Sequence, residues 1–253
     1  MNRRRWLAGA AATLGAAFTS ACDRMAASPV VQQALRMAEG LTRRTQRLIL
    51  PRDALAPTYD RSDISPDFRP NGSIDPQASD YLALKANGFA DYRLVIDGMV
   101  ARPLSLSLPE LRTRPSQSQI TKHDCVEGWT SIAEWTGIRL ETLLNEAGLK
   151  PQAKYIVFHC FDALDQTENG DRYYESIDLV DARHPQTILA WAMNGEALPV
   201  PHGAPLRLRV ERQLGYKHAK YIRRIEAVES FAHLGRGRGG YWEDRGYEWY
   251  AGI

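Results

Sequence analysis

The chain predicts an α+β domain, because short alternating segments of apolar and polar residues are mixed with short amphipathic segments. Its 253 residues suffice for one large domain with a buried core. Apolar residues make up 44% and charged residues 25% of the chain, which is ordinary for a globular protein. The formal net charge is only +2, and no basic block of the kind that binds nucleic acid is present. We therefore expect no nucleic-acid partner.

Residues 1–27 predict an export signal. Arg3, Arg4 and Arg5 precede an alanine-rich apolar stretch that is too short for a comfortable membrane span. The order Arg-Arg-x-aromatic-Leu is typical of a twin-arginine signal, so we expect a periplasmic protein that is exported folded. A general-secretion signal or an uncleaved anchor is the alternative. Cys22 lies in an imperfect lipoprotein site and could anchor the protein to the membrane, while simple cleavage near Ala21 or Ala27 is equally open.

Residues 28–77 predict an N-terminal helix and then an extended segment. Apolar residues between Val30 and Leu41 share one helical stripe, and Pro51 ends the helix. We expect this stripe to pack onto the domain rather than to contact a membrane. The stretch 56–77 is rich in Pro, Asp, Ser and Gly, which predicts an irregular conformation.

Residues 78–235 hold most of the regular elements. The alternation of residues 92–100 with a turn at Asp97-Gly98 predicts a hairpin. Residues 140–148 predict an amphipathic helix that ends at Gly148. The other expected elements are a short helix over 106–111, strands over 118–123, 154–160, 206–210 and 221–228, and a strand or short helix over 188–193 before a turn at Asn194-Gly195.

Cys125 is the first candidate for chemistry. It lies in the polar, glycine-containing run His-Asp-Cys-Val-Glu-Gly-Trp, which is unlike a core strand. A thiolate suits a soft or redox-active metal, and one cysteine can bond a metal that an organic ligand already holds. A buried structural cysteine is the alternative. If Cys125 binds a metal, it cannot pair with Cys160, which we therefore expect to be a free thiol.

Three motifs in order resemble the molybdopterin-binding domain of the sulfite oxidase family. They are Cys-Val-Glu-Gly-Trp from Cys125, Glu-Trp-Thr-Gly from Glu134 and His-Gly-Ala-Pro-Leu-Arg from His202. The similarity runs from about Arg93 to Val228, and the closest branch is the periplasmic methionine sulfoxide reductase catalytic subunit. It implies a sulfite-oxidase-type fold of mixed sheets with short helices. We expect no C-terminal dimerisation domain and no haem in this chain, and hence a monomer.

The resemblance also implies a ligand set for a molybdenum ion held by one molybdopterin. Cys125 is the expected metal ligand, and Arg207 and Lys220 are the expected phosphate ligands. His202 stands where the resembled branch usually has Asn, and Gly203 permits close backbone approach. The further cofactor contacts that we expect are Arg69, Asn71, Cys160, His218 and Ala219. The alternatives are a surface loop at Arg69 and Asn71 and a solvated pair at Lys217 and Lys220.

The roles of the remaining site candidates are less specific. Tyr173 and Tyr174 could face the substrate as catalytic residues, together with Glu175. We expect Glu127 to accept backbone hydrogen bonds at the turn. Trp129 and Trp135 are expected to pack rather than to stack on a substrate, and Asp178 and His184 are expected to be structural.

The resemblance implies a periplasmic oxidoreductase that transfers an oxygen atom. The leading substrates are sulfoxides such as methionine sulfoxide, with electrons from a membrane or soluble cytochrome. Sulfite oxidation is the enzymatic alternative, but it normally needs an arginine cluster, and none stands beside Cys125 in the sequence. A cofactor-binding electron carrier without turnover is the second alternative.

Residues 236–253 form an aromatic tail. Five large aromatic residues lie between Tyr241 and Tyr250. Disordered tails are poor in aromatic residues, so we expect this one to cover apolar surface. It could wrap the back of the domain, which we favour, or it could lie at the rim of the cofactor funnel.

Overall fold

The computed structural model describes residues 28–164 and 171–253, in two compact units that divide after Leu50. The predicted export signal and Cys22 lie outside the described residues. The first unit contains helix α2 (Pro29–Ile49), which begins with a proline that suits a first helical turn. The predicted N-terminal helix is thus confirmed. Within the described ranges, no helix is long and apolar enough to cross a membrane.

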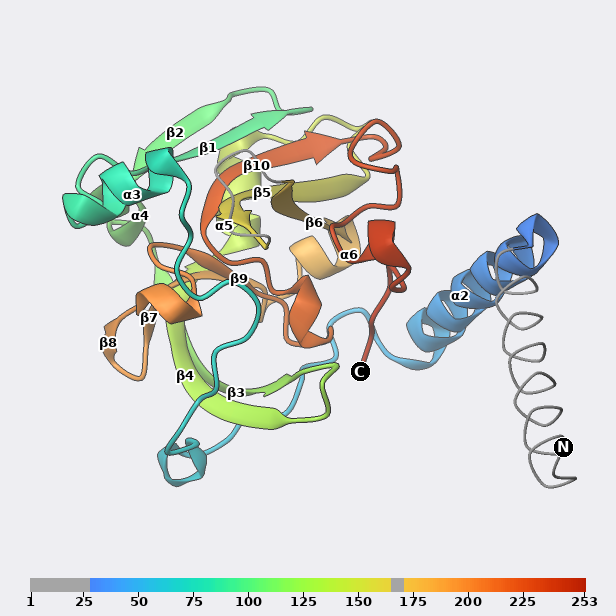
Figure 1. Ribbon diagram of the computed structural model, residues 1–253, viewed down its shortest axis with the longest axis horizontal. Helices are drawn as coiled ribbons and strands as arrows, with labels where there is room; N and C mark the ends of the chain where they lie inside the picture. Colours follow the sequence, from blue (N-terminus) through green and yellow to red (C-terminus); the bar gives the residue numbers. More distant parts are fainter. Residues whose placement is uncertain (1–27, 165–170) are drawn as a thin grey trace, which may run out of the picture. The chain divides into compact units, whose positions relative to one another are not determined.

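The second unit is built on two sheets (Figure 1). The first has five strands in the order β2-β1-β10-β5-β6. β1 pairs with β10 in parallel, and the other neighbours are antiparallel, which gives the mixed sheet that was expected. The strand bounds are β1 Arg93–Gly98, β2 Leu104–Ser107, β5 Tyr155–Ala163, β6 Arg172–Asp178 and β10 Ile222–Val228.

The second sheet runs in the order β3-β4-β7-β8, and β9 pairs with β7 beside this path. Its bounds are β3 Ser116–Asp124, β4 Thr130–Arg139, β7 Ile188–Met193, β8 Glu196–Ala197 and β9 Arg207–Arg209. β3 and β4 form a long antiparallel hairpin that curls at the opposite end of the unit from β1 and β2 (Figure 1). Cys125 stands in the turn of this hairpin.

Short helices join the strands. They are α3 Ser79–Ala86, α4 Leu108–Arg112, α5 Leu140–Ala147, α6 Leu179–Ala182 and the 3-10 turns η1 Arg61–Asp63, η2 Val200–His202, η3 Gly215–Lys217 and η4 Glu243–Arg245. α5 ends as predicted, because Gly148 adopts a left-handed conformation with φ 71°. β4, β6, α3 and α6 were not predicted, and the expected helix over 106–111 begins two residues later, at Leu108.

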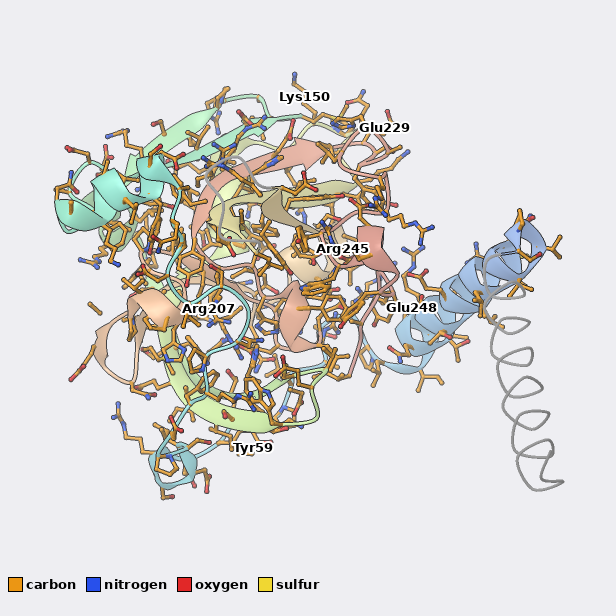
Figure 2. All side chains as sticks on the ribbon, in the orientation of Figure 1. Tyr59, Lys150, Arg207, Glu229, Arg245 and Glu248 are labelled. Carbon is orange, nitrogen blue, oxygen red and sulfur yellow. The ribbon has the colours of Figure 1, made fainter. Side chains whose placement is uncertain are left out.

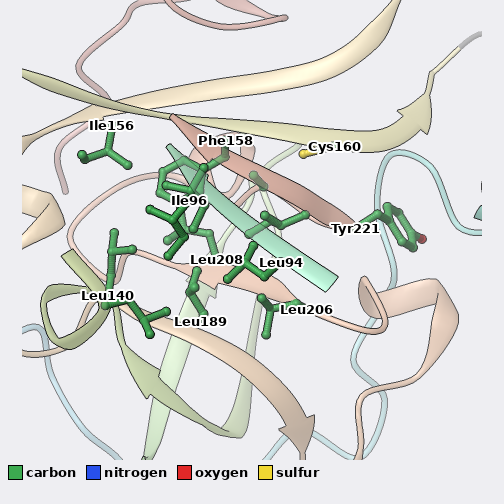
Figure 3. Packing of buried hydrophobic residues seen from close by; sticks show 14 of the residues in the cluster. Leu94, Ile96, Leu140, Ile156, Phe158, Cys160, Leu189, Leu206, Leu208 and Tyr221 are labelled. Carbon is green, nitrogen blue, oxygen red and sulfur yellow. The ribbon is translucent and has the colours of Figure 1, made fainter. Parts of the chain in front are cut away.

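The main core lies where the two sheets approach each other. Leu94 and Phe158 of the first sheet and Leu189 and Leu208 of the second are fully buried in one cluster (Figure 3). Cys160 is buried in the same cluster, and both it and Cys125 are free thiols. Side chains fill the unit throughout, as Figure 2 shows, so the two sheets hold the functional residues on a rigid frame.

The aromatic tail packs against this frame. Tyr241, Glu243 and Asp244 are buried, and Gly252 forms an isolated bridge with Gln213. Trp249 stacks on Phe231, with ring centroids 5.8 Å apart. The expectation that the tail covers apolar surface is therefore met in the structure. Trp242 and Tyr247 lie at the cavity beside Cys125, however, and not at the back of the domain that we favoured.

Candidate active site

A cavity of about 160 Å³ opens beside Cys125. The Cys125 side chain is 9% exposed, and the Asn71 amide nitrogen lies 3.7 Å from its sulfur. The cavity therefore presents one thiol, oriented by one weak hydrogen bond. Its lining residues come from the extended segment, the β3–β4 turn, strands β5 and β6, the η3 loop and the tail: Asn71, Gly72, Ser73, Cys125, Val126, Glu127, Asp162, Leu164, Tyr173, Gly215, Tyr216, His218, Lys220, Trp242 and Tyr247.

The β3–β4 turn fixes the position of the thiol. The Cys125 N–H donates to the Trp129 carbonyl at 3.0 Å, and the Gly128 N–H donates to the Cys125 carbonyl at 3.0 Å. Glu127 accepts from the Trp129 indole N–H at 2.9 Å. We expected Glu127 to accept from the backbone. The donor is instead an indole, while the N–H groups of Cys125 and Gly128 pair within the turn.

Two buried cations meet next to the cavity. The Arg207 guanidinium donates to the His202 carbonyl at 2.9 Å and lies beside η2 (Figure 2). The Lys220 ammonium donates to the carbonyls of Asn71, Ser73 and Pro201. These carbonyls are neutral, so neither charge is balanced by them.

Gly203 explains how the two cations come together. Its φ of +113° suits glycine, and an added Cβ would lie 3.0 Å from the Lys220 side chain and 3.2 Å from that of Arg207. A larger residue here would push the cations apart. The glycine of the His-Gly-Ala-Pro motif is therefore required by packing.

Trp135 lies beneath two guanidinium groups. The Arg207 and Arg209 guanidinium carbons are 4.6 and 4.5 Å from its ring centroid. Arg209 is compensated by Glu211 at 2.5 Å, with both side chains buried. Arg207 forms no ion pair with any carboxylate in the described part of the chain, and burial and Arg209 lower its pKa to about 9. A buried, uncompensated guanidinium is costly unless an anion binds to it.

Two neutral histidines complete this region. The rings of His123 and His218 meet edge to face at 5.1 Å, and burial first, then Arg209, lowers the pKa of each well below its ordinary value. Arg209 lies 3.0 Å from His123 Nδ1, which places the proton of the neutral ring on Nε2. A Cβ on Gly215 would lie 2.6 Å from that Nε2, so this position accepts only glycine without rearrangement.

Several buried polar atoms around the cavity have no partner within the described ranges. They are Ser73 Oγ, Asp162 Oδ1, His218 Nδ1 and Arg207 Nε. Such atoms are costly unless a ligand or water satisfies them. Together with the uncompensated Arg207 charge, they fit a polar, anionic cofactor such as molybdopterin.

The pKa values of Asp162 and Lys220 are both shifted to about 7. Burial raises the pKa of Asp162 to about 7, and burial and Arg207 lower the pKa of Lys220 to about 7. The three carbonyls around the Lys220 ammonium use all of its donors, which favours its charged form. We therefore assign the ammonium as protonated, so its positive charge lies beside the cavity although its three N–H groups are already donated.

The structure brings one of the two predicted tyrosines to the cavity. Tyr173 lines it, and its hydroxyl donates to the Tyr216 carbonyl at 2.5 Å. Tyr174 is not among the described residues that line the cavity, because adjacent strand residues face opposite sides. Its hydroxyl donates to Asp244 of the tail at 2.6 Å. Glu175 is fully buried and is not among the described residues that line the cavity.

The other four predicted cofactor contacts, Arg69, His202, Ala219 and Cys160, are not among the described residues that line the cavity. Arg69 is exposed, 6.0 Å from the Trp129 ring, and does not line the cavity as described. His202 packs edge to face on Phe68, and burial and Arg207 lower its pKa to about 4. Ala219 is buried, and its carbonyl accepts from Leu208 at 2.8 Å. Cys160 is buried in the core, where burial raises the pKa of its thiol well above the ordinary value.

Lys217 was considered as half of a solvated pair with Lys220, and that alternative is wrong. Its ammonium is buried between Glu175 at 2.5 Å and Glu243 at 2.6 Å. The predictions of structural roles for Trp135, Asp178 and His184 are confirmed. Trp135 is fully buried, Asp178 caps α6, and His184 lies 3.0 Å from the Ala54 carbonyl.

The sequence did not identify several lining residues. Ser73 and Asp162 carry no motif, and only the folded chain shows that they are buried and unpartnered. Trp242 and Tyr247 belong to the tail, whose aromatic content was the only indication of a role. Among the described residues, no group of three or more His, Cys, Asp or Glu side chains could hold a metal ion. A metal would therefore need ligands from a cofactor, as the single thiol suggested.

Comparisons with known proteins agree with this geometry. Residues 82–233 match the family described as the oxidoreductase molybdopterin binding domain. A protein of Azospira oryzae, provisionally named protein-methionine-sulfoxide reductase subunit YedZ1, is 35% identical over 223 residues, or 88% of this chain and 77% of that protein. The protein-methionine-sulfoxide reductase catalytic subunit MsrP of Gluconobacter oxydans is 36% identical over 147 residues, or 54% of this chain and 47% of that protein.

Among solved structures, the sulfane dehydrogenase SoxCD of Paracoccus pantotrophus matches with a TM-score of 0.50 and 28% identity, over 56% of this chain and 39% of that chain. Fold, cavity and comparisons together define a molybdopterin-binding oxidoreductase. Within that class, the chain belongs to the sulfite oxidase family.

Proposed function

We propose that this protein is a molybdenum-dependent reductase of sulfoxides such as methionine sulfoxide. The observation that carries the proposal is the character of the cavity. Its described lining contains four aromatic residues and no arginine. A sulfite dianion normally needs arginines, whereas a sulfoxide is neutral and carries apolar groups. The relatives named as methionine sulfoxide reductases support the same substrate class.

The reaction converts a sulfoxide, two electrons and two protons into a thioether and water. Bound molybdopterin supplies a metal that can accept an oxygen atom and exchange two electrons. The Cys125 thiolate would bind this metal, and the Asn71 amide would hold the sulfur in place at 3.7 Å. Arg207, whose Nε has no partner among the described residues, would donate to the phosphate of the cofactor, and the charge of Lys220 would attract that phosphate.

Two residues that line the cavity would stay neutral. Tyr173 stays protonated, since burial raises its pKa well above the ordinary value, and its hydroxyl is held by Tyr216. His218 remains neutral and presents an unprotonated Nδ1 that can accept a hydrogen bond from the cofactor. These groups can orient a ligand without adding charge to the cavity.

The proposal includes a compartment and a partner. The twin-arginine pattern of the first seven residues supports folded export to the periplasm. The proposal leaves room for a membrane anchor at Cys22. A monomer that receives electrons from a membrane or soluble cytochrome is consistent with a chain in which we expect no haem. The names of the relatives support the sulfoxide, but they do not specify the electron donor.

One assay tests the function. Purified holoprotein is supplied with reduced viologen and a panel of sulfoxides, and separately with sulfite and an electron acceptor. We expect sulfoxide-dependent viologen oxidation and little sulfite-dependent reduction. Faster sulfite oxidation would favour a sulfite dehydrogenase. A protein that retains molybdenum but turns over neither class would be an electron carrier.

A further inference from the structure

The C-terminal tail supplies one side of the Cys125 cavity. Trp242 and Tyr247 both line it, and their rings stack with centroids 5.1 Å apart and an interplanar angle of 28°. The Tyr216 ring meets Tyr247 edge to face at 5.1 Å. Tyr247 is 39% exposed, so the stacked pair reaches from the cavity to the surface. We call Trp242 and Tyr247 the aromatic wall.

The aromatic wall is held firmly from both sides. Tyr241, immediately before it, is buried and stacks on Tyr173 with centroids 5.5 Å apart. Glu243, immediately after it, is buried in an ion pair with Lys217. A wall fixed in this way loses little conformational entropy when a ligand binds.

The chemistry of the aromatic wall suits an organic sulfur compound. Aromatic faces pack favourably against sulfur and against alkyl groups. The cationic side chain that lines the cavity is Lys220, which is already bonded to three carbonyls. The cavity as described thus offers an apolar surface to a substituent and no free guanidinium to a small dianion.

We propose that the aromatic wall selects the substrate by packing against the alkyl or aryl substituent of the sulfoxide. This inference rests on the proposed function and adds a substrate class, namely sulfoxides with an apolar substituent larger than methyl. Because Tyr247 reaches the surface, a methionine sulfoxide side chain that projects from a peptide can contact it. Small sulfoxides gain less from the wall, since they bury less area against it.

Kinetics of matched substrates test the inference. We compare methionine sulfoxide in a short peptide with dimethyl sulfoxide, using holoprotein with Trp242→Leu and Tyr247→Leu combined. The ratio of kcat/KM for peptide over dimethyl sulfoxide should fall about tenfold, which corresponds to the loss of about 1.4 kcal/mol of contact. The change should lie in KM for the peptide. Tyr247→Phe keeps the ring and should retain the wild-type ratio.

Trp249→Phe is the matched control within the tail. Trp249 packs on Phe231 and Tyr155, and it is not one of the described cavity residues. This control should leave the ratio unchanged. A wild-type ratio in the double variant would show that the aromatic wall does not select the substrate, and it would leave the proposed sulfoxide reduction intact. Loss of molybdenum from the double variant would also overturn the inference, because the pair would then hold the cofactor. A wild type inactive on every sulfoxide would overturn both proposals.

Discussion

The Cys125 thiol stands alone at the cavity, held by the β3–β4 turn and by one amide 3.7 Å away. Serine at this position would offer a hard oxygen in place of a soft sulfur. We predict that Cys125→Ser lowers turnover by at least roughly a hundredfold, since even outer partners of a metal ligand cost 10–100-fold. The fold should persist, because the turn is set by backbone hydrogen bonds. Specific activity, measured beside far-ultraviolet circular dichroism, checks both parts, and activity within a few-fold of wild type would refute the ligand role.

Arg207 and Arg209 offer a contrast between two buried guanidinium groups. We predict that Arg207→Met weakens cofactor retention by about 1.5–3 kcal/mol, the value of a charge-assisted hydrogen bond to the phosphate. The same change should stabilise the cofactor-free protein, because it removes an uncompensated buried charge. Molybdenum content measures cofactor retention. The urea midpoint of the cofactor-free protein, compared with that of the cofactor-bound protein, measures the gain in stability.

Arg209→Met is the matched variant. It leaves Glu211 buried without its partner, so we expect both forms to lose about 3–5 kcal/mol of stability. Full molybdenum content in Arg207→Met would exclude a phosphate role for that residue.

The residues of the site were predictable where a motif carried them. Cys125, Arg207 and Lys220 stand at fixed places in short motifs, and the structure brings them to one region of the unit. Ser73 and Asp162 were not predictable, because their importance lies in burial without a partner, which depends on contacts distant in sequence. Tyr174 was expected at the cavity because it follows Tyr173 in the sequence. Adjacent residues of a strand point to opposite faces, however, so only Tyr173 lines the cavity as described.

Strand β6, the η3 loop and the tail are joined by one buried cluster of Glu175, Lys217 and Glu243. Burial first, and then Glu243, raises the pKa of Glu175 well above its ordinary value of 4.5. The folded protein therefore binds a proton that the unfolded chain releases above that pH. The contribution of Glu175 to the free energy of unfolding is therefore complete below pH 4.5, and it is lost as the pH rises toward the pKa of Glu175 in the folded protein.

We predict that Glu175→Gln removes this dependence, because the amide copies the protonated carboxyl. Between about pH 5 and 8, the wild-type Tm should fall relative to that of the variant, by roughly 4 °C or less for each kcal/mol lost. Thermal unfolding at a series of pH values measures it. Glu127→Gln changes an exposed carboxyl and serves as the control. Parallel curves for wild type and Glu175→Gln would show that the cluster holds no extra proton.

The sequence predicted those helices and strands in which the pattern of apolar residues matches the burial of the side chains. β5 and β10 are apolar or alternating and were recognised as strands, whereas β7 was expected as a strand or a short helix. β4 was missed because it contains Glu134 and Gly137, which are untypical of a core strand. The structure gives Gly137 a packing role, since an added Cβ would lie 2.1 Å from the Leu189 carbonyl of β7. Glu134 pairs with Arg61 at 2.9 Å. Neither partner can be inferred from the local sequence.

At the scale of the whole molecule, the proposed route of export has its own test. A cofactor that is to be held by residues from both sheets must be bound by a folded chain, and a twin-arginine system carries folded proteins. We predict that changing Arg3 and Arg4 to Lys leaves precursor in the cytoplasm with cofactor bound. Cell fractionation with molybdenum analysis measures it, and unchanged periplasmic holoprotein would exclude this route.

The position of the aromatic wall in the chain has a consequence for biosynthesis. Trp242 and Tyr247 leave the ribosome after every other residue that lines the cavity. Both sheets can therefore form around Cys125 while one side of the cavity is still open. We expect the nascent or newly released chain to pass through a stage in which a bulky cofactor can enter from that side, and docking of the tail then completes the part of the cavity that receives the substrate. In this order of events, the late synthesis of the tail keeps the entrance open until the rest of the site has been made.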